Sequence, residues 1–357
     1  MKEETAIFFK KLAQTIAANV PFVVYRKPNE NLVTVVVQNT TKLYHLNTFL
    51  EKGFVFSPYS KTAHKIIFPA SKSKMFEAEL SDFEDLGVGV QGVDAELNMC
   101  DNEVKNNHIL LTKKAIDFIQ HKNAEKIVIS RKEVLERNNF EVLNSYKKML
   151  KNYKNAMVYL WFHPKVGCWM GASPERLIHM HKNEFKTMAL AGTQSFENTT
   201  EVVWKTKEKE EQQFVTDYIL DTVKDAIKNI KISKPYTVKA GSLLHLRTDI
   251  SGELKCEDGL GNLIDSLHPT PAVCGLPKHI ATNFILENEM YDRSFYTGYL
   301  GELNVKNETN LYVNLRCMEI EKNQISLFVG GGITKDSLAE NEWRETVFKA
   351  EIMKEIL

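Results

Sequence analysis

The grouping of the predicted strands is the feature that most constrains the fold of this sequence. Short apolar runs follow one another near the N-terminus, and turn signals such as Lys27-Pro28-Asn29 separate them, which favours an antiparallel meander. These first runs are Phe22–Tyr25, Leu32–Val37, Gly53–Phe56 and Lys65–Phe68. Because strands come in runs rather than in strict alternation with helices, we predict an α+β fold with large, mostly antiparallel sheets and helices outside them.

The rest of the chain continues this mixture. Further strands are predicted at Lys126–Ser130, Ala156–Phe162, Gly167–Met170, Arg176–His181, Glu184–Leu190, Tyr236–Val238, Leu243–Thr248, Tyr296–Leu303, Leu311–Glu319 and Ile325–Val329. Helices are predicted over the first 20 residues or so, at Ile109–Gln120, from Lys132 to about Lys151, from about Lys207 to Ile230, at Leu260–Leu267, from Lys278 to about Glu287, and at the C-terminus. The helix from Lys207 has the clearest period, because its apolar residues recur at helical spacing.

Residues 71–107 are polar and acidic with little periodicity, and we interpret them as a long connection. Neither an internal repeat nor a domain linker stands out in the sequence. We therefore expect one domain, with a strand-rich N-terminal part (residues 1–107) and a C-terminal region (residues 108–357) that carries the candidate functional residues.

Composition excludes several classes of function. The chain of 357 residues has 43% hydrophobic residues and no net charge, so there is no overall electrostatic attraction to nucleic acid or to a membrane surface. No run approaches the roughly 18 apolar residues of a membrane span. The five cysteines are scattered without a C-x-x-C pair, which favours reduced thiols and a cytoplasmic protein.

Three consecutive glycines, Gly330–Gly332, end an apolar run and precede the closing helix. Glycines at a strand end predict a close approach of the backbone to another group. On the helix, Glu342, Glu345 and Lys349 share one face, which continues into apolar residues. Since unpaired buried carboxylates are costly, a divalent cation would explain them; the alternative is a solvated first turn that complements the helix dipole. Glu211 lies in the same way on the apolar stripe of the helix from Lys207.

Three further residues suit catalysis or binding. Lys126 opens an apolar strand, where desolvation would make it usable as a base; the alternative is a lysine that reaches water. Glu175 follows Pro174 at a turn and suits a general acid, or else pairs with Arg176. Arg316 lies in a predicted buried strand, where its guanidinium suits a carboxylate.

The histidines give weaker signals. His179 and His181 point to one face of a strand, but no third ligand has recognisable spacing, so we interpret them as structural. His245 is ambiguous between a core histidine and a ligand contact.

Eight motifs follow one another from about Glu125 to the end of the chain, which are KIVISR, GASPERL, LAGT, KEKEEQQFV, HPTPAVCG, NLRC, LFVGGGI and ENEWRET. In these motifs and in their order the chain resembles the chorismate-utilising enzymes, the family of isochorismate, salicylate, anthranilate and aminodeoxychorismate synthases. This resemblance implies the family's α+β fold and a chorismate-binding catalytic region over residues 108–357.

Within the family, the resemblance favours isochorismate synthase. Lys126 stands where isochorismate and salicylate synthases carry a water-activating lysine, and Ala191 stands where aminodeoxychorismate synthases carry a nucleophilic lysine. The HPTPA segment is similar to the isochorismate synthase version of its loop. A salicylate synthase is the nearest alternative, and a catalytically silent relative that binds a dicarboxylate or a partner protein is an alternative from another class.

The resemblance also implies roles for single residues. Glu211 and Glu345 would hold Mg²⁺, which grips the ring carboxylate of chorismate. Lys126 would activate a water that attacks C2, and Glu175 would protonate the departing C4 hydroxyl. The remaining substrate contacts are expected from Gly192, Thr193, Ala272, Arg316, Gly330 and Lys349.

The expected context is a monomer without a glutaminase subunit, because only the aminating enzymes of the family need ammonia. The product would feed menaquinone or siderophore biosynthesis. No nucleic-acid or membrane partner is expected.

Overall fold

The computed structural model describes residues 2–80, 86, 102–121, 123–137, 140–196, 199–240, 243–256 and 259–357. Its helices are α1 (Lys2–Ala17), α2 (Asn102–Gln120), α3 (Val142–Asn152), α4 (Thr206–Val223), α5 (Leu260–Leu267), α6 (Lys278–Asn288) and α7 (Ala339–Lys354), with a 3-10 turn η1 (Ala70–Lys72). No helix in these ranges is long and apolar enough to cross a membrane.

The described strands form two large sheets, in which neighbouring strands are antiparallel. The order in sheet A is β14 (Gly275–Leu276), β6 (Lys126–Glu136), β18 (Gln324–Ile333), β17 (Cys317–Ile320), β8 (Gly167–Ser173), β7 (Met157–His163), β1 (Phe22–Arg26), β2 (Leu32–Gln38) and β5 (Ser73–Glu79). The order in sheet B is β11 (Ile227–Ile232), β13 (Leu243–Leu254), β10 (Glu184–Ser195), β9 (Arg176–His181), β16 (Glu308–Val313), β15 (Tyr299–Val305), β3 (Gly53–Ser57) and β4 (Ile66–Pro69), and β12 (Tyr236–Ala240) also pairs with β13. The predicted α+β class with antiparallel sheets is confirmed.

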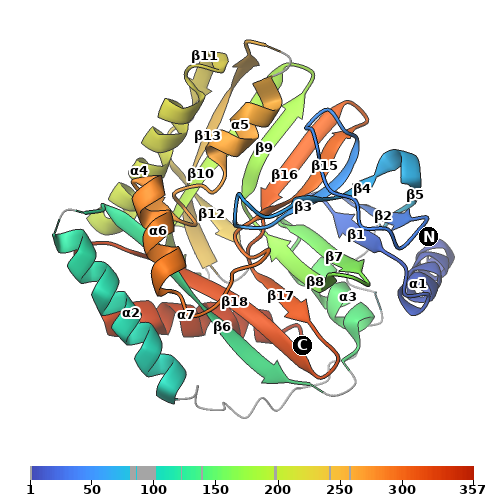
Figure 1. The fold of residues 1–357 in the computed structure, drawn as a ribbon, viewed down its shortest axis with the longest axis horizontal. Coiled ribbons are helices and arrows are strands. Elements are labelled where there is room, and N and C mark those ends of the chain that lie inside the picture. Colours follow the sequence, from blue (N-terminus) through green and yellow to red (C-terminus); the bar gives the residue numbers. More distant parts are fainter. Residues whose placement is uncertain are drawn as a thin grey trace.

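An aromatic core fills the space between the two sheets. Rings from both sheets meet in it, as where Phe68 of β4 stacks on Trp161 of β7 with centroids 5.3 Å apart, and Phe295 of the loop before β15 stacks on Phe56 of β3 at 4.2 Å. Side chains of α1, α3 and α7 pack on the outer face of sheet A, and those of α4 and α5 pack on the outer face of sheet B. Helices therefore lie outside both sheets (Figure 1).

The N-terminal strands belong to both sheets. β1 pairs with β7 and extends sheet A, whereas β3 pairs with β15 and extends sheet B. The first 80 residues therefore complete sheets whose other strands come from much later in the chain.

Two predicted helices are shorter than expected. The helix predicted from Lys132 is wrong in its first part, because β6 continues to Glu136 and α3 begins only at Val142. Residues 132–136 pair with β18 and alternate between exposed and half-buried positions, which is a strand pattern. The helix predicted to reach Ile230 ends at Val223, and the chain returns as the edge strand β11.

The structure corrects two other predictions. The strand predicted over Leu311–Glu319 is broken after Val313, because the chain crosses there from sheet B to sheet A. In the predicted connection 71–107, Ser73–Glu79 forms β5 and α2 begins at Asn102. Most of the residues between them lie outside the described ranges.

Candidate active site

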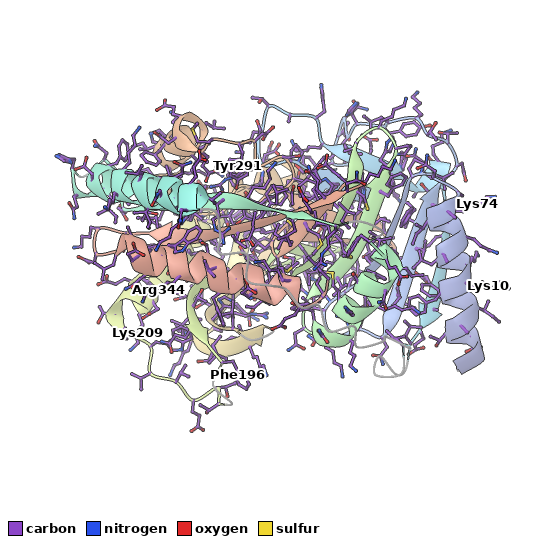
Figure 2. The ribbon with its side chains drawn as sticks, turned by 90° about the horizontal axis from the view of Figure 1, so that it is seen from below. Lys10, Lys74, Phe196, Lys209, Tyr291 and Arg344 are labelled. Carbon is purple, nitrogen blue, oxygen red and sulfur yellow. The ribbon has the colours of Figure 1, made fainter. Side chains whose placement is uncertain are left out.

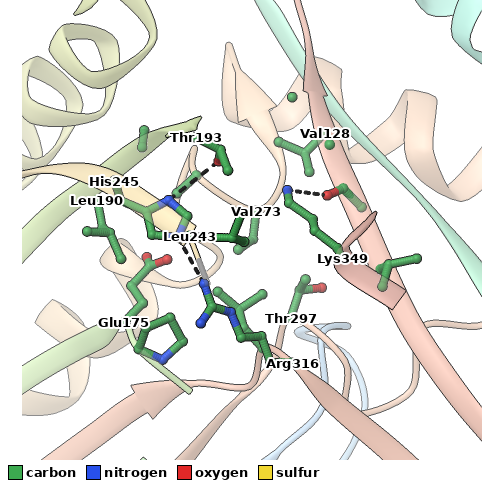
Figure 3. Close-up of a pocket in the computed structure, with 18 of the residues that line it drawn as sticks. Val128, Glu175, Leu190, Thr193, Leu243, His245, Val273, Thr297, Arg316 and Lys349 are labelled. Carbon is green, nitrogen blue, oxygen red and sulfur yellow. Dashed lines mark hydrogen bonds between the residues drawn. The ribbon is translucent and has the colours of Figure 1, made fainter. Parts of the chain in front are cut away.

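A cavity of about 130 Å³ lies where the two sheets, α4, α7 and the loop after α5 meet. Every predicted site residue except Lys126 lines it, and Lys126 is bonded to one that does. Figure 3 shows Glu175, Thr193, His245, Arg316 and Lys349 around this cavity. The tertiary structure therefore brings together residues spread over more than 200 positions of the sequence.

Lys126 is the first residue of β6 and is only 1% exposed. Its Nζ lies 2.8 Å from Oε1 of Glu211 on α4, in an ion pair. The alternative of a lysine that reaches water is wrong, because burial leaves the ammonium group to the protein's own partners. The pair joins a strand of sheet A to a helix that covers sheet B.

Gly332 makes room for this pair. A Cβ atom at Gly332 would lie 2.7 Å from Glu211 Oε1 and 2.8 Å from Lys126 Cε. The predicted close approach at the glycine triplet is therefore confirmed. The three glycines belong to β18 rather than to a loop, because they pair with residues 128–130 of β6.

Glu175 lies between β8 and β9 and is 3% exposed. Burial raises the pKa of its carboxyl group to about 7, while a hydrogen bond from Thr270 Oγ1 (3.3 Å) and the positive charge of Lys126 lower it. The side chain of Arg176 instead lies over the ring of Tyr312, with its Cζ 5.8 Å from the centroid. Glu175 is thus a buried carboxyl that is about half protonated near neutral pH.

Arg316 occupies the crossing between β16 and β17 rather than the interior of a strand. Its φ of +48° lies in the left-handed region. Its Nη2 lies 2.9 Å from His245 Nε2, and His245 Nδ1 lies 2.9 Å from the carbonyl oxygen of Gly192. Burial and the charge of Arg316 lower the pKa of His245 to about 3, so the ring is neutral. Nδ1–H donates to Gly192 and leaves Nε2 to accept from Arg316.

A bulge in β10 forms another part of the cavity wall. The register with β13 shifts between Ala191 and Gln194, which leaves Gly192 and Thr193 unpaired at the cavity. Gly192 has a φ of +73°, and a Cβ there would lie 3.1 Å from the Cβ of Glu208. A glycine is therefore required at this position by both conformation and space.

The acidic face of the closing helix points at the glycine triplet. Glu342 is 3% exposed, and a Cβ at Gly331 would lie 3.7 Å from an oxygen of Glu342 and from one of Glu345. Lys349 Nζ lies 2.8 Å from Glu345 Oε1 and 2.8 Å from the carbonyl oxygen of Gly330. The solvated-turn alternative is wrong for Glu342, which is buried.

The carboxylates of this site suit a hard cation. Glu211 and Glu345 line the same cavity, and Mg²⁺ is usually bound through one or two carboxylates, with water and substrate oxygens as its other ligands. Within the described residues, no group of three or more His, Cys, Asp or Glu side chains is arranged to hold a metal. Glu211 and Glu345 are the residues that would hold such a cation.

Sequence reasoning did not identify Glu208, Thr270 or the role of His245. Oε2 of Glu208 is buried and has no hydrogen-bond partner among the described residues. Glu208 precedes Glu211 by three residues, the spacing that also relates Glu342 to Glu345, and this repeated spacing was the available signal. The histidines His179 and His181 lie on β9, away from the lining of the cavity.

Comparisons with known proteins show the family of this chain. The family model of the chorismate binding enzymes matches residues 77–357. The chain is 30% identical over 196 residues to isochorismate synthase EntC of Escherichia coli (strain K12), covering 52% of this chain and 50% of the relative. It is 34% identical over 194 residues to isochorismate synthase MenF of Pasteurella multocida (strain Pm70), covering 51% and 45%. These alignments span about half the length of the curated relatives.

Solved structures share the fold over almost the whole chain. A putative 2,3-dihydroxybenzoate-specific isochorismate synthase, DhbC from Bacillus anthracis, aligns with a TM-score of 0.80 at 21% identity over 95% of this chain and 96% of the other. The menaquinone-specific isochorismate synthase MenF from Escherichia coli aligns with a TM-score of 0.77 at 19% identity, covering 94% and 88%. The family match covers well over half of the sequence and includes every described residue that lines the candidate site. The chain therefore belongs to the chorismate-binding enzymes.

Proposed function

We propose that the protein is an isochorismate synthase, which converts chorismate reversibly to isochorismate. The observation that carries this proposal is a buried carboxyl group of pKa about 7, that of Glu175, in the wall of a cavity beside which a buried lysine, Lys126, is held by Glu211. A group whose pKa lies near the working pH transfers protons efficiently as a general acid. The similarity of the chain to isochorismate synthases supports the same assignment.

The reaction needs one proton acceptor and one proton donor, and we assign these roles to Lys126 and Glu175. Lys126 acts in its uncharged amine form and accepts a proton from the water that forms the new C2–O bond. The double bonds shift as the C4–O bond breaks, and Glu175 gives its proton to the departing hydroxyl, so that water leaves. One water enters and one leaves, and the net change is the movement of a hydroxyl group from C4 to C2.

Mg²⁺ is the cofactor that we propose, held by Glu211 and Glu345. When bound, it supplies a Lewis acid that neutralises the ring carboxylate of chorismate. In this structure Glu211 pairs with Lys126 and Glu345 pairs with Lys349. These lysines keep the charges of the two carboxylates compensated inside the protein.

The substrate's other groups have partners in the same cavity. Arg316 presents a buried guanidinium group for the second carboxylate, held in place by His245. Gly192, Thr193 and Ala272 line the space for the ring, together with Gly330 and Lys349. The LAGT segment carries Ala191, so it provides no lysine nucleophile for an amination. We therefore propose that no glutaminase subunit is needed. We also propose that the protein is a monomer.

Product analysis tests this proposal. The pure protein is incubated with chorismate and Mg²⁺, with ammonium added in a parallel tube. We expect isochorismate alone in both tubes, and no turnover after chelation with EDTA. Salicylate with pyruvate would show a salicylate synthase, an aminated product would contradict the roles of Lys126 and Ala191, and unchanged chorismate would leave a silent binding protein. The product is proposed to enter menaquinone or siderophore biosynthesis.

A further inference from the structure

A second cavity, of about 550 Å³, adjoins the candidate active site at Arg316. The two cavities share Arg316 and Ile352 in their walls. On the side of the second cavity, the hydroxyl group of Tyr153 donates a hydrogen bond of 3.0 Å to the carbonyl oxygen of Ile352. Arg316 therefore stands in the partition, with its guanidinium group bonded to His245 on the active-site side.

The second cavity is strongly cationic. Among the described residues, Lys151, Lys154 and Lys239 line it in addition to Arg316, and one carboxylate, that of Glu355, lines it as well. These cations come from the end of α3, from the loop after it and from β12, so the fold has gathered them from separate segments. Because the whole chain carries no net charge, this excess of positive charge is a local feature.

The positive region extends beyond this cavity. A third cavity, of about 320 Å³, shares Asn155 and Lys239 with the second and is also lined by Arg176 and by Arg247, which is paired with Asp249 at 2.6 Å. The Nζ of Lys239 lies 3.4 Å from the ring centroid of Phe196, a cation–π contact that holds the lysine at the rim. Phe196 lies at the periphery of the molecule (Figure 2). Positive charge thus runs from the surface to Arg316.

We propose that the second cavity is the antechamber through which the dicarboxylate substrate reaches the active site. Lys151, Lys154 and Lys239 attract the dianion, and Arg316 receives one carboxylate as it passes the partition. A depression lined mainly by one sign of charge focuses the electric field and raises the arrival rate of an oppositely charged ligand. The proposal rests on the proposed function for the identity of the substrate as chorismate.

The test compares two triple variants of equal charge change. The first is Lys151→Gln/Lys154→Gln/Lys239→Gln. The matched control is Lys10→Gln/Lys74→Gln/Lys322→Gln, at exposed positions; Lys10 and Lys74 lie at the α1 end of the molecule (Figure 2). At low ionic strength we expect the first variant to lose about tenfold in kcat/KM for chorismate, with kcat unchanged. The control should keep the wild-type value.

Salt dependence provides the second measurement. Screening shortens the reach of charge to about 3 Å at 1 M salt, so the difference between the wild type and the first variant should close as salt rises. Equal kcat/KM for the two triple variants at low salt would overturn the proposal. So would a loss confined to kcat, which would place the lysines in the chemical step or in an effector site.

Failure of the proposed function can be told apart from failure of the antechamber. If the wild type leaves chorismate unchanged, the same proteins are compared for the association rate of isophthalate, an aromatic dicarboxylate that requires no turnover. Slower, less salt-dependent association in the first variant supports the entry route. Equal association rates in all three proteins overturn it.

Discussion

At the scale of single residues, the environment of Glu175 decides its chemistry. Burial raises the pKa of its carboxyl group to about 7, and Thr270 and Lys126 act in the opposite direction. The motif that contains Glu175 predicted a general acid, but it did not contain Thr270, which lies 95 positions later in the chain. The proton affinity of this group is therefore a property of the assembled site.

Removing the Thr270 hydroxyl should move the pH profile of the enzyme. The hydrogen bond from Thr270 favours the ionised carboxylate and lowers its pKa, so Thr270→Val should raise that pKa. Because the protonated form is the acid, the alkaline limb of kcat should shift to higher pH. Thr187→Val is the control, since it also removes a buried hydroxyl, which donates to Leu177 on the neighbouring strand. If the alkaline limb of the kcat profile of Thr270→Val stayed in place or moved to lower pH, this would contradict the role of Glu175.

The same raised pKa has a cost in stability. The folded-state pKa of Glu175 is about 7 and its ordinary value is 4.5, so the folded state loses stability as the pH rises from about 4.5 to about 7. A shift of this size corresponds to about 3 kcal/mol above that range. Glu175→Gln should therefore abolish turnover and increase the free energy of unfolding by up to about 3 kcal/mol at pH 8, with little change at pH 4.

Urea unfolding at the two pH values measures this effect. Glu210→Gln, at an exposed position of α4, serves as the control. It should leave the free energy of unfolding unchanged at both pH values. An equal gain for Glu175→Gln at pH 4 and pH 8 would show that the stabilisation does not come from titration of the carboxyl.

At the scale of elements, β18 holds the site together. It pairs with β6 along ten residues, and its glycines allow Lys126 of β6, Glu211 of α4 and the acidic face of α7 to approach the same backbone. A side chain on this part of the strand would occupy the space of a catalytic contact. Neighbouring glycines differ in this respect, because successive positions of a strand face opposite sides.

This difference predicts unlike effects of two alanine substitutions. In Gly332→Ala, the new Cβ would lie 2.7 Å from Glu211 Oε1 and 2.8 Å from Lys126 Cε, so both side chains must move. We expect at least a tenfold loss of kcat and a higher requirement for Mg²⁺, with little loss of stability, because flexible side-chain ends can shift. Gly331→Ala is the matched control, since its closest contacts are at 3.7 Å, and it should stay within about threefold of the wild type. Equal activities of the two variants would refute this account.

At the scale of the whole molecule, the candidate site lies between parts of the fold that pack on different sheets. Glu211 belongs to α4, which covers sheet B, whereas Glu345 belongs to α7, which packs on β18 of sheet A. A cation held by both carboxylates would bridge the two halves of the structure. Its binding should therefore be visible in the stability of the entire protein.

Adding Mg²⁺ should raise the melting temperature of the free enzyme. A ligand at 100 times its Kd stabilises the folded state by about 2.7 kcal/mol, which corresponds to a rise of a few degrees. Glu211→Gln/Glu345→Gln should abolish the rise. The control Glu210→Gln/Glu340→Gln removes two exposed carboxylates from the same helices and should keep it. Loss of the rise in both double variants would indicate nonspecific screening instead of a site.

Some elements of the fold follow from local sequence patterns, and others depend on pairing between distant segments. Local patterns predicted most strands, the apolar stripe Val215–Val223 of α4 and the fold class, because these depend on neighbouring residues. Where a local pattern suits both a helix and a strand, pairing with a distant segment decided between them. Residues 132–136 pair with β18 as a strand, and the segment after Val223 forms a strand at the edge of sheet B. The crossing at Arg316 was not predictable either, since both flanking strands are buried and read as one run.

The sequence by itself determined the fold class, the family resemblance and the identities of the predicted site residues, because each of these is written in residue types and their spacing along the chain. Only the tertiary structure decided that these residues share one cavity, that Lys126 pairs with Glu211 and that Arg316 rests on a neutral His245. It also decided the pKa of Glu175 and the cationic cavity beside Arg316. Burial and electrostatic interaction depend on distances in space, and these are set only when distant segments pack together.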